Sequence, residues 1–319
     1  KPMLGIILFA IGLIFVVKGA DWLVDGACSL ARRLGVSDLA IGLTVVAFGT
    51  SLPELTVSVF AAVQGQPAVA FGNVTGSNIC NILLILGMAS LFCPLGVQKN
   101  TTWKEIPFSF LAGALLLVMA SDRLLDGASQ NILSRTDGFG LLALFAIFLA
   151  YIAGMAKDLP EVVQQGEHII HSAGKSLLLL AAGLAFLIAG GKLVVLGAVQ
   201  VATAMGLSES FVAVTLVAVG TSLPELATSV VAAYKKKADI AIGNVVGSNI
   251  FNVFLILGVS SVMRQIPVPD DLRLSLYVGV LAVVLLLIFL LIGQRHILQR
   301  WQGLVLLAVY VIYLIGQPR

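Results

Sequence analysis

The chain has 319 residues, of which 59% are hydrophobic and 11% charged, and its formal net charge is +3. Soluble globular domains carry about 25% charged residues, so this composition, with a mean hydropathy of +1.05, excludes a soluble globule and indicates an integral membrane protein. The small net charge gives no sign of a nucleic-acid partner, and no protein partner is evident. The three cysteines lie in apolar runs and have the spacing of neither a disulfide framework nor a metal site.

A helix needs about 20 mainly apolar residues to cross a bilayer. On that basis the sequence predicts an all-α membrane protein of ten transmembrane helices. We expect the first apolar run, from Met3, to be retained, because it shows no small-residue cleavage site. The predicted spans are 3–30, 37–64, 67–93, 106–121, 138–156, 175–203, 208–234, 239–262, 273–293 and 301–316.

Two sequence motifs occur twice, each time 171 residues apart. The first is GTSLPEL, at 49–55 and 220–226, and the second is GN-x-x-GSNI-x-N, at 72–81 and 243–252. The polar connection 157–174 separates the copies, so we expect a five-helix repeat at 1–156, a linker loop and a second five-helix repeat at 175–319. Because five is an odd number, equivalent helices cross the membrane in opposite directions, which is the inverted repeat typical of secondary transporters.

Loop charges predict the orientation. Lysine and arginine number eleven in the connections on the side of Lys235, Lys236 and Lys237, and six on the other side. Basic residues favour the cytoplasm, so the sequence predicts a cytoplasmic linker at 157–174, both chain ends outside and a location in the cell membrane.

Charged residues also occur within two spans. In the first span, Lys18 and Asp21 are three positions apart, so we expect them to pair on one helix face. In the sixth span, Lys192 occupies the repeat position of Asp21, and the sequence alone gives it no role.

The first motif predicts a broken helix. Pro53 lacks an N–H and its ring clashes with the carbonyl of Gly49, four residues earlier. Glu54 then stands in the first turn of a new half-helix, where the helix dipole favours a carboxylate. The second copy repeats this arrangement with Gly220, Pro224 and Glu225.

The second motif predicts a polar stripe beside those carboxylates. Asn73, Ser77 and Asn81 are four positions apart and share one helix face. The second copy repeats the stripe with Asn244, Ser248 and Asn252. Glycines four apart allow close helix packing, so we expect broken helices 2, 3, 7 and 8 to surround one site at the membrane midplane.

The predicted donors at this site are all oxygens: two carboxylates and four hydroxyl groups, from Thr50, Ser51, Thr221 and Ser222. Such donors suit Ca²⁺ or Na⁺ and suit zinc or copper poorly. The two negative charges would be neutralised by one Ca²⁺, by two Na⁺ or by protons. No cofactor is implied.

Three functions remain open at this point. A cation antiporter uses inverted repeats with broken helices, whereas a cation channel could be built from the same donors. An intramembrane hydrolase using Ser51 or Glu54 is disfavoured, because no histidine or lysine base lies in either motif. The sequence therefore predicts a transporter and no enzyme.

The paired motifs resemble the two alpha repeats of the sodium/calcium exchanger family, within the cation/calcium exchanger superfamily, and the chain is similar in length to a prokaryotic member. The resemblance implies a Ca²⁺ site formed by Thr50, Glu54, Thr221 and Glu225. It also implies Na⁺ sites that share Glu54 and Glu225 and add Ala47, Ser51, Ser77, Asn81, Ala218, Ser222, Ser248 and Asn252. The family further suggests that spans 1 and 6 slide across the rest of the protein to alternate access.

Two positions in the second motif indicate which ion is exchanged for Ca²⁺. Proton/calcium exchangers typically have an acid in the second motif, where this chain has Gly76 and Gly247, which argues against proton coupling. Relatives that depend on potassium often have aspartate at the position of Asn252, so asparagine argues against potassium transport. We therefore expect K⁺-independent, electrogenic Na⁺/Ca²⁺ antiport.

Overall fold

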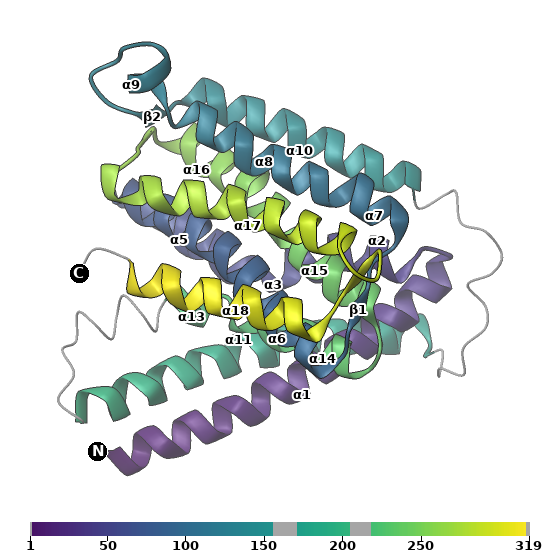
Figure 1. Cartoon of the computed structure of the whole chain (residues 1–319). Coiled ribbons are helices and arrows are strands. Elements are labelled where there is room, and N and C mark those ends of the chain that lie inside the picture. Colours follow the sequence, from purple (N-terminus) through teal and green to yellow (C-terminus); the bar gives the residue numbers. More distant parts are fainter. Residues whose placement is uncertain (1, 156–170, 205–217, 317–319) are drawn as a thin grey trace.

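The computed structural model of the chain describes residues 2–155, 171–204 and 218–316. These residues form mainly helices, most of which run roughly along one common direction (Figure 1). Seven helices in this part are long and apolar enough to cross a membrane, or eight when a bent pair is counted as one span. The first residues of α1 and the last residues of α18 lie on the same side of the molecule (Figure 1).

The continuous helices agree closely with the predicted spans. They are α1 (Pro2–Leu34), α8 (Glu105–Met119), α10 (Arg135–Met155), α11 (Ala173–Ala204), α17 (Arg273–Leu291) and α18 (Arg300–Ile315). Short helices α7 (Lys99–Trp103) and α9 (Asp122–Leu125) and the 3-10 turn η6 (Asp270–Leu272) lie in the connections. Of the predicted span 208–234, residues 208–217 lie outside the described part, and the remainder forms α13 (Ala218–Thr221) and α14 (Leu223–Tyr234).

The first motif interrupts its helix as predicted. The segments α2 (Asp38–Ile41), η1 (Gly42–Val46) and α3 (Ala47–Thr50) lead to Ser51, after which α4 (Leu52–Val63) starts at an angle of 48°. Ser51 has φ −82° and ψ 5°, outside helical geometry. Pro53 lies in the first turn of α4, where its missing N–H removes no helical hydrogen bond. Ser222 and Pro224 repeat this geometry between α13 and α14.

The glycines of this motif have a second role that their sequence did not show. A Cβ atom on Gly49 would lie 2.6 Å from Leu184 Cδ2 of α11, and one on Gly220 would collide with Val195 of the same helix. Gly49 and Gly220 therefore let α11 approach both helix breaks.

The prediction that helices 3 and 8 are broken is wrong. Helix 3 runs continuously through α5 (Pro67–Ile79), the π-helical segment η2 (Cys80–Ile85) and α6 (Leu86–Phe92). Helix 8 likewise runs through α15 (Ala238–Ile250), η5 (Phe251–Leu257) and α16 (Gly258–Met263). Neither contains a proline after its first turn, so nothing removes a backbone donor. Each has instead a wider turn, of the kind that often marks functional sites.

Two short ladders modify the all-α prediction. Strand β1 (Leu95–Gly96) pairs antiparallel with β4 (Ile297–Leu298), and β2 (Ile132–Leu133) pairs antiparallel with β3 (Ile266–Pro267). Each ladder joins a connection of the first half to one of the second. Two-residue strands lack the alternating pattern by which a sequence predicts a strand.

Helices α1 and α11 pack against each other along most of their length, on one side of the other helices (Figure 1). Glycine occurs at every seventh position of α1, at Gly5, Gly12, Gly19 and Gly26. A Cβ atom on Gly12 would lie 2.6 Å from the backbone nitrogen of Val194. The small residues of both helices therefore let the two backbones touch.

The expected pairing of Lys18 with Asp21 is wrong. The Asp21 carboxylate lies 2.7 Å from Lys235 Nζ, and Lys235 is also 2.7 Å from Asp25. Lys235 follows the last residue of α14, which packs along α1. The partner thus comes from a different helix, which residue spacing within α1 cannot indicate.

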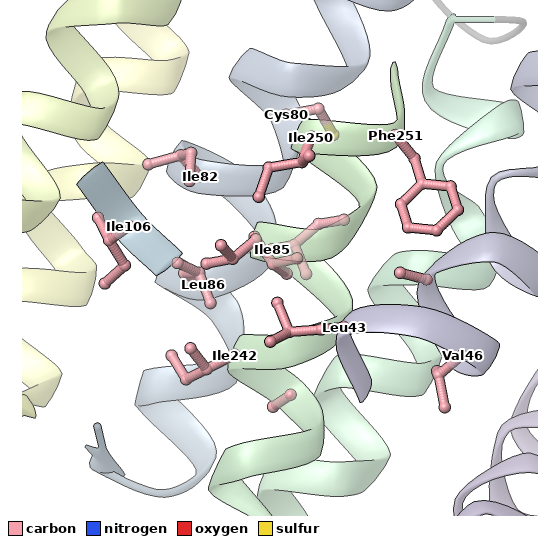
Figure 2. Close-up of a cluster of buried hydrophobic side chains, with 14 of the residues drawn as sticks. Leu43, Val46, Cys80, Ile82, Ile85, Leu86, Ile106, Ile242, Ile250 and Phe251 are labelled. Atoms are coloured by element: carbon pink, nitrogen blue, oxygen red, sulfur yellow. The ribbon is translucent and has the colours of Figure 1, made fainter. Parts of the chain in front are cut away.

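A buried apolar cluster holds the motif segments in place. Figure 2 shows Leu43 of η1, Ile82 and Ile85 of η2, and Ile242 and Ile250 of α15 gathered in this cluster. Within a bilayer such side chains stabilise the helix contacts through close van der Waals packing, because lipid is as apolar as they are. Residues from both halves of the sequence share this core.

Candidate cation site

The two helix breaks exchange hydrogen bonds between the halves of the chain. Ser51 Oγ donates to Glu225 Oε1 at 3.0 Å, and Ser222 Oγ donates to Glu54 Oε1 at 3.2 Å. The two glutamates are 0% and 1% exposed. Each carboxylate therefore faces the helix break of the other half, and the two negative charges share one buried region.

Several acceptor atoms in this region have no hydrogen-bond partner among the described residues. They include one oxygen of each glutamate, two amide oxygens and one hydroxyl: Glu54 Oε2, Glu225 Oε2, Asn81 Oδ1, Asn252 Oδ1 and Ser248 Oγ. Burying a polar oxygen without a partner costs about 1–3 kcal/mol, and more for a charged group. Cations bound to these oxygens would remove that cost.

Threonine and asparagine side chains form a scaffold around the glutamates. Asn73 Nδ2 donates to the backbone oxygen of Glu54 and to Ser58 Oγ, at 3.3 and 3.0 Å. Asn244 makes the equivalent bonds, to the backbone oxygen of Glu225 and to Ser229 Oγ, at the same two distances. Asn73 and Asn244 thus fix the start of α4 and α14 and position their carboxylates.

The two predicted threonine ligands contact this scaffold across the halves. Thr50 Oγ1 donates to Asn244 Oδ1 at 3.0 Å and also contacts the backbone oxygen of Ala47 at 3.3 Å. Thr221 Oγ1 donates to Asn73 Oδ1 at 3.4 Å. Both threonines therefore lie beside the carboxylates that the sequence analysis assigned to the same site.

The remaining predicted sodium ligands lie around this centre. Ser77 is buried and accepts a hydrogen bond from Ser222 Oγ at 3.2 Å. Ala47 is buried at the start of α3, and Ser248 is buried in α15. Ala218 is the first residue of α13, but its side chain lies outside the described part of the structure.

Four asparagines form a network that the sequence analysis did not anticipate. Asn81 Nδ2 donates to Asn249 Oδ1, and Asn252 Nδ2 donates to Asn78 Oδ1, both at 2.9 Å. Asn78 and Asn249 also each donate to the other's backbone oxygen, at 3.3 and 3.4 Å. Both are repeated in the motif, but they stand one position away from the stripe, so the four-residue spacing does not include them. Their amides hold Asn81 and Asn252 with the free oxygens described above.

The donor set favours hard cations. It contains carboxylate, amide and hydroxyl oxygens, which are the ligands that Ca²⁺ and Na⁺ prefer. In the described ranges, no group of three or more histidine, cysteine, aspartate or glutamate side chains could hold a metal ion. A cation at this centre would have two carboxylates and would complete its coordination shell with neutral oxygens.

Comparisons with known proteins identify relatives of the whole chain. The sequence model described as "Sodium/calcium exchanger protein" matches residues 4–154 and 175–317. A putative antiporter, CaxA of Alkalimonas amylolytica, is 36% identical, with 95% of each chain covered. The sodium/calcium exchanger MaX1 of Methanosarcina acetivorans is 32% identical, with 97% of each covered. The solved structure of the exchanger NCX_Mj, soaked with Na⁺ and Sr²⁺, matches with a TM-score of 0.85, 35% identity and full coverage of both chains.

Proposed function

The chain belongs to the sodium/calcium exchanger family, a family of multi-pass membrane antiporters, and from this premise we propose that it exchanges Na⁺ for Ca²⁺ by alternating access, independently of K⁺ and with net movement of charge. The observation that carries the proposal is the crossed pairing of Ser51 with Glu225 and of Ser222 with Glu54. This pairing brings two buried carboxylates and their unpartnered oxygens to one centre.

In this mechanism the same oxygens bind either cargo. Glu54 and Glu225, with Thr50 and Thr221, hold one Ca²⁺, whose two charges neutralise both carboxylates. Sodium ions occupy sites that share these glutamates and add Ala47, Ser51, Ser77, Asn81, Ala218, Ser222, Ser248 and Asn252. Ca²⁺ and Na⁺ therefore compete for the same negative charge, and one leaves when the other binds.

The architecture we propose is a pair of inverted five-helix repeats, 1–156 and 175–319, joined by the linker 157–174. The eight spans of the described part, α18 and the predicted span 208–234 together give ten. Support comes from hydrogen bonds that occur once in each repeat. Asn73 donates to Ser58, and Asn244 donates to Ser229, so that both the donor and the acceptor recur 171 residues later. We further propose that α1 and α11, held together at their glycines, move as one unit past the helix breaks.

Transport by reconstituted protein tests the function directly. We expect proteoliposomes loaded with Na⁺ and placed in Na⁺-free, K⁺-free medium to take up Ca²⁺, and empty or K⁺-loaded liposomes to take up none. If three Na⁺ leave for each Ca²⁺, the interior loses one positive charge, so an inside-positive potential should accelerate uptake. Ca²⁺ uptake without a Na⁺ gradient would identify a channel instead.

Orientation is tested by labelling. We propose that both chain ends lie outside the cell and that Lys236 lies inside. In a variant without Cys28, Cys80 and Cys93, a single cysteine at position 2 should react with an impermeant thiol reagent added to intact cells. A single cysteine at position 236 should not. The opposite pattern would reverse the orientation and leave the repeat intact.

Asn252 tests the coupling chemistry. Its Nδ2 donates to Asn78 Oδ1 at 2.9 Å. In Asn252→Asp only the protonated acid can still donate this bond, because the ionised form has only acceptors. We therefore expect Ca²⁺ uptake by this variant to change more steeply with pH than uptake by the unmodified protein, and to respond to K⁺.

The measurement is uptake against pH, with and without K⁺, in both proteins. The variant Asn131→Asp is a control, because Asn131 lies near β2 and outside the site. Identical pH profiles, or a K⁺ requirement in the unmodified protein, would contradict this reading of Asn252.

A further inference from the structure

Lys192 is a charged residue in the interior of a long apolar helix. It lies in α11, which extends over 32 residues, and its side chain is exposed. Charges within spanning helices are costly and are found where they have a function or reach water. Among the described residues, Lys192 forms no salt bridge with an acidic side chain. Its repeat counterpart Asp21, by contrast, is paired with Lys235.

A cavity of about 290 Å³ is lined both by Lys192 and by Thr221, one of the proposed Ca²⁺ ligands. Its wall includes Thr56 and Lys192, which are exposed, and Thr221 and Pro224, which are buried. Pro53 of the other helix break also lines it. The cavity therefore extends from exposed side chains to a proposed Ca²⁺ ligand, and it has room for several water molecules.

We propose that Lys192 is a specificity-determining residue, whose ammonium group repels cations entering this cavity and does so more strongly for Ca²⁺ than for Na⁺. This inference rests on the proposed function of the site. The electrostatic energy of an ion is proportional to its charge. The factor by which the Lys192 charge lowers the occupancy of Ca²⁺ is therefore the square of the factor by which it lowers the occupancy of Na⁺. A positive charge on the cavity wall thus weakens the entry of each Ca²⁺ more than the entry of each Na⁺.

The size of the effect follows from Coulomb's law. Two unit charges about 10 Å apart in water change an occupancy by about twofold, and a divalent ion by about fourfold. Removing the charge in Lys192→Gln should therefore lower the apparent KM for Ca²⁺ by about fourfold and the half-inhibiting Na⁺ concentration by about twofold. Reversing the charge in Lys192→Glu should lower the KM for Ca²⁺ by about sixteenfold and the half-inhibiting Na⁺ concentration by about fourfold. These factors should shrink as choline chloride is added, because salt screens the charge.

Matched variants separate charge from packing. Lys18 is an exposed lysine inside α1, and it does not line this cavity. We expect Lys18→Gln to leave both constants unchanged and Lys192→Arg to resemble the unmodified protein. Equal factors for Ca²⁺ and Na⁺, or factors that do not respond to salt, would overturn the proposal.

A chemical test avoids the risk that a charge variant fails to fold. In the background without native cysteines, Lys192→Cys is purified and then modified with a cationic or an anionic methanethiosulfonate reagent. The cationic adduct should restore the KM for Ca²⁺, and the anionic adduct should lower it further. Equal effects of the two reagents would refute the proposal. Failure of the proposed exchange is recognised separately, as Ca²⁺ uptake by the unmodified protein without Na⁺.

Discussion

Replacing either Glu54 or Glu225 by glutamine should abolish Na⁺-driven Ca²⁺ uptake. Each substitution removes half of the site's negative charge and places an NH₂ group where a carboxylate oxygen has no hydrogen-bond partner and is proposed to bind the cation. Losing one partner of a buried charged interaction costs about 2–5 kcal/mol, which corresponds to at least about 30-fold in affinity. Both variants retain an oxygen that can accept the hydrogen bond from Ser222 or Ser51, so we expect them to fold.

Glu105→Gln is the matched control for these variants. Glu105 is a third fully buried glutamate, and it accepts a hydrogen bond from Tyr151 on α10 instead of from either motif. Its replacement keeps an oxygen for Tyr151, so the apparent KM for Ca²⁺ should stay near that of the unmodified protein. The measurement is ⁴⁵Ca²⁺ uptake by protein that is monodisperse after purification. Near-original uptake by Glu54→Gln or Glu225→Gln would remove these residues from the mechanism.

The second large effect is expected from Gly247→Ala. A Cβ atom at this position would lie 2.8 Å from the backbone oxygen of Leu43 and 2.8 Å from Ala47 Cβ. Both neighbours belong to packed helical backbone, so α15 must move away from η1 and α3. Overpacking of this kind costs about 1–3 kcal/mol. The same movement displaces Ser248 relative to Ala47, two proposed Na⁺ ligands, so the apparent Na⁺ affinity should fall together with thermal stability.

Gly140→Ala is the matched control, because an added methyl group at this position has space. Its Cβ would lie 3.7 Å from Met119 Cε, an ordinary contact, and alanine favours a helix over glycine by about 1 kcal/mol. We expect this variant to be at least as stable as the original and equally active. The unfolding temperature in detergent and the inhibition of Ca²⁺ uptake by Na⁺ are measured for Gly247→Ala, Gly140→Ala and the unmodified protein. If Gly247→Ala unfolds at the original temperature and keeps its Na⁺ dependence, the close approach of α15 to η1 is wrong.

The sequence by itself determined the features that arise within one helix. Proline chemistry at Pro53 and Pro224 is local, because the missing donor and the ring clash act on the same turn, and the bends follow at Ser51 and Ser222. The displacement of 171 marked the residues that recur in both halves. Composition and span length gave the membrane class, because the bilayer requires long apolar helices.

The tertiary structure decided which groups meet. Glu54 bonds to Ser222 rather than to a residue of its own motif, and Asp21 pairs with Lys235 rather than with Lys18. Such contacts depend on how helices far apart in sequence pack, and periodicity within one helix carries no information about its neighbours. For the same reason Asn78 and Asn249 became visible only as a pair across the halves. The proposed role of Lys192 likewise depends on tertiary structure, because residues of α4, α11, α13 and α14 line one cavity.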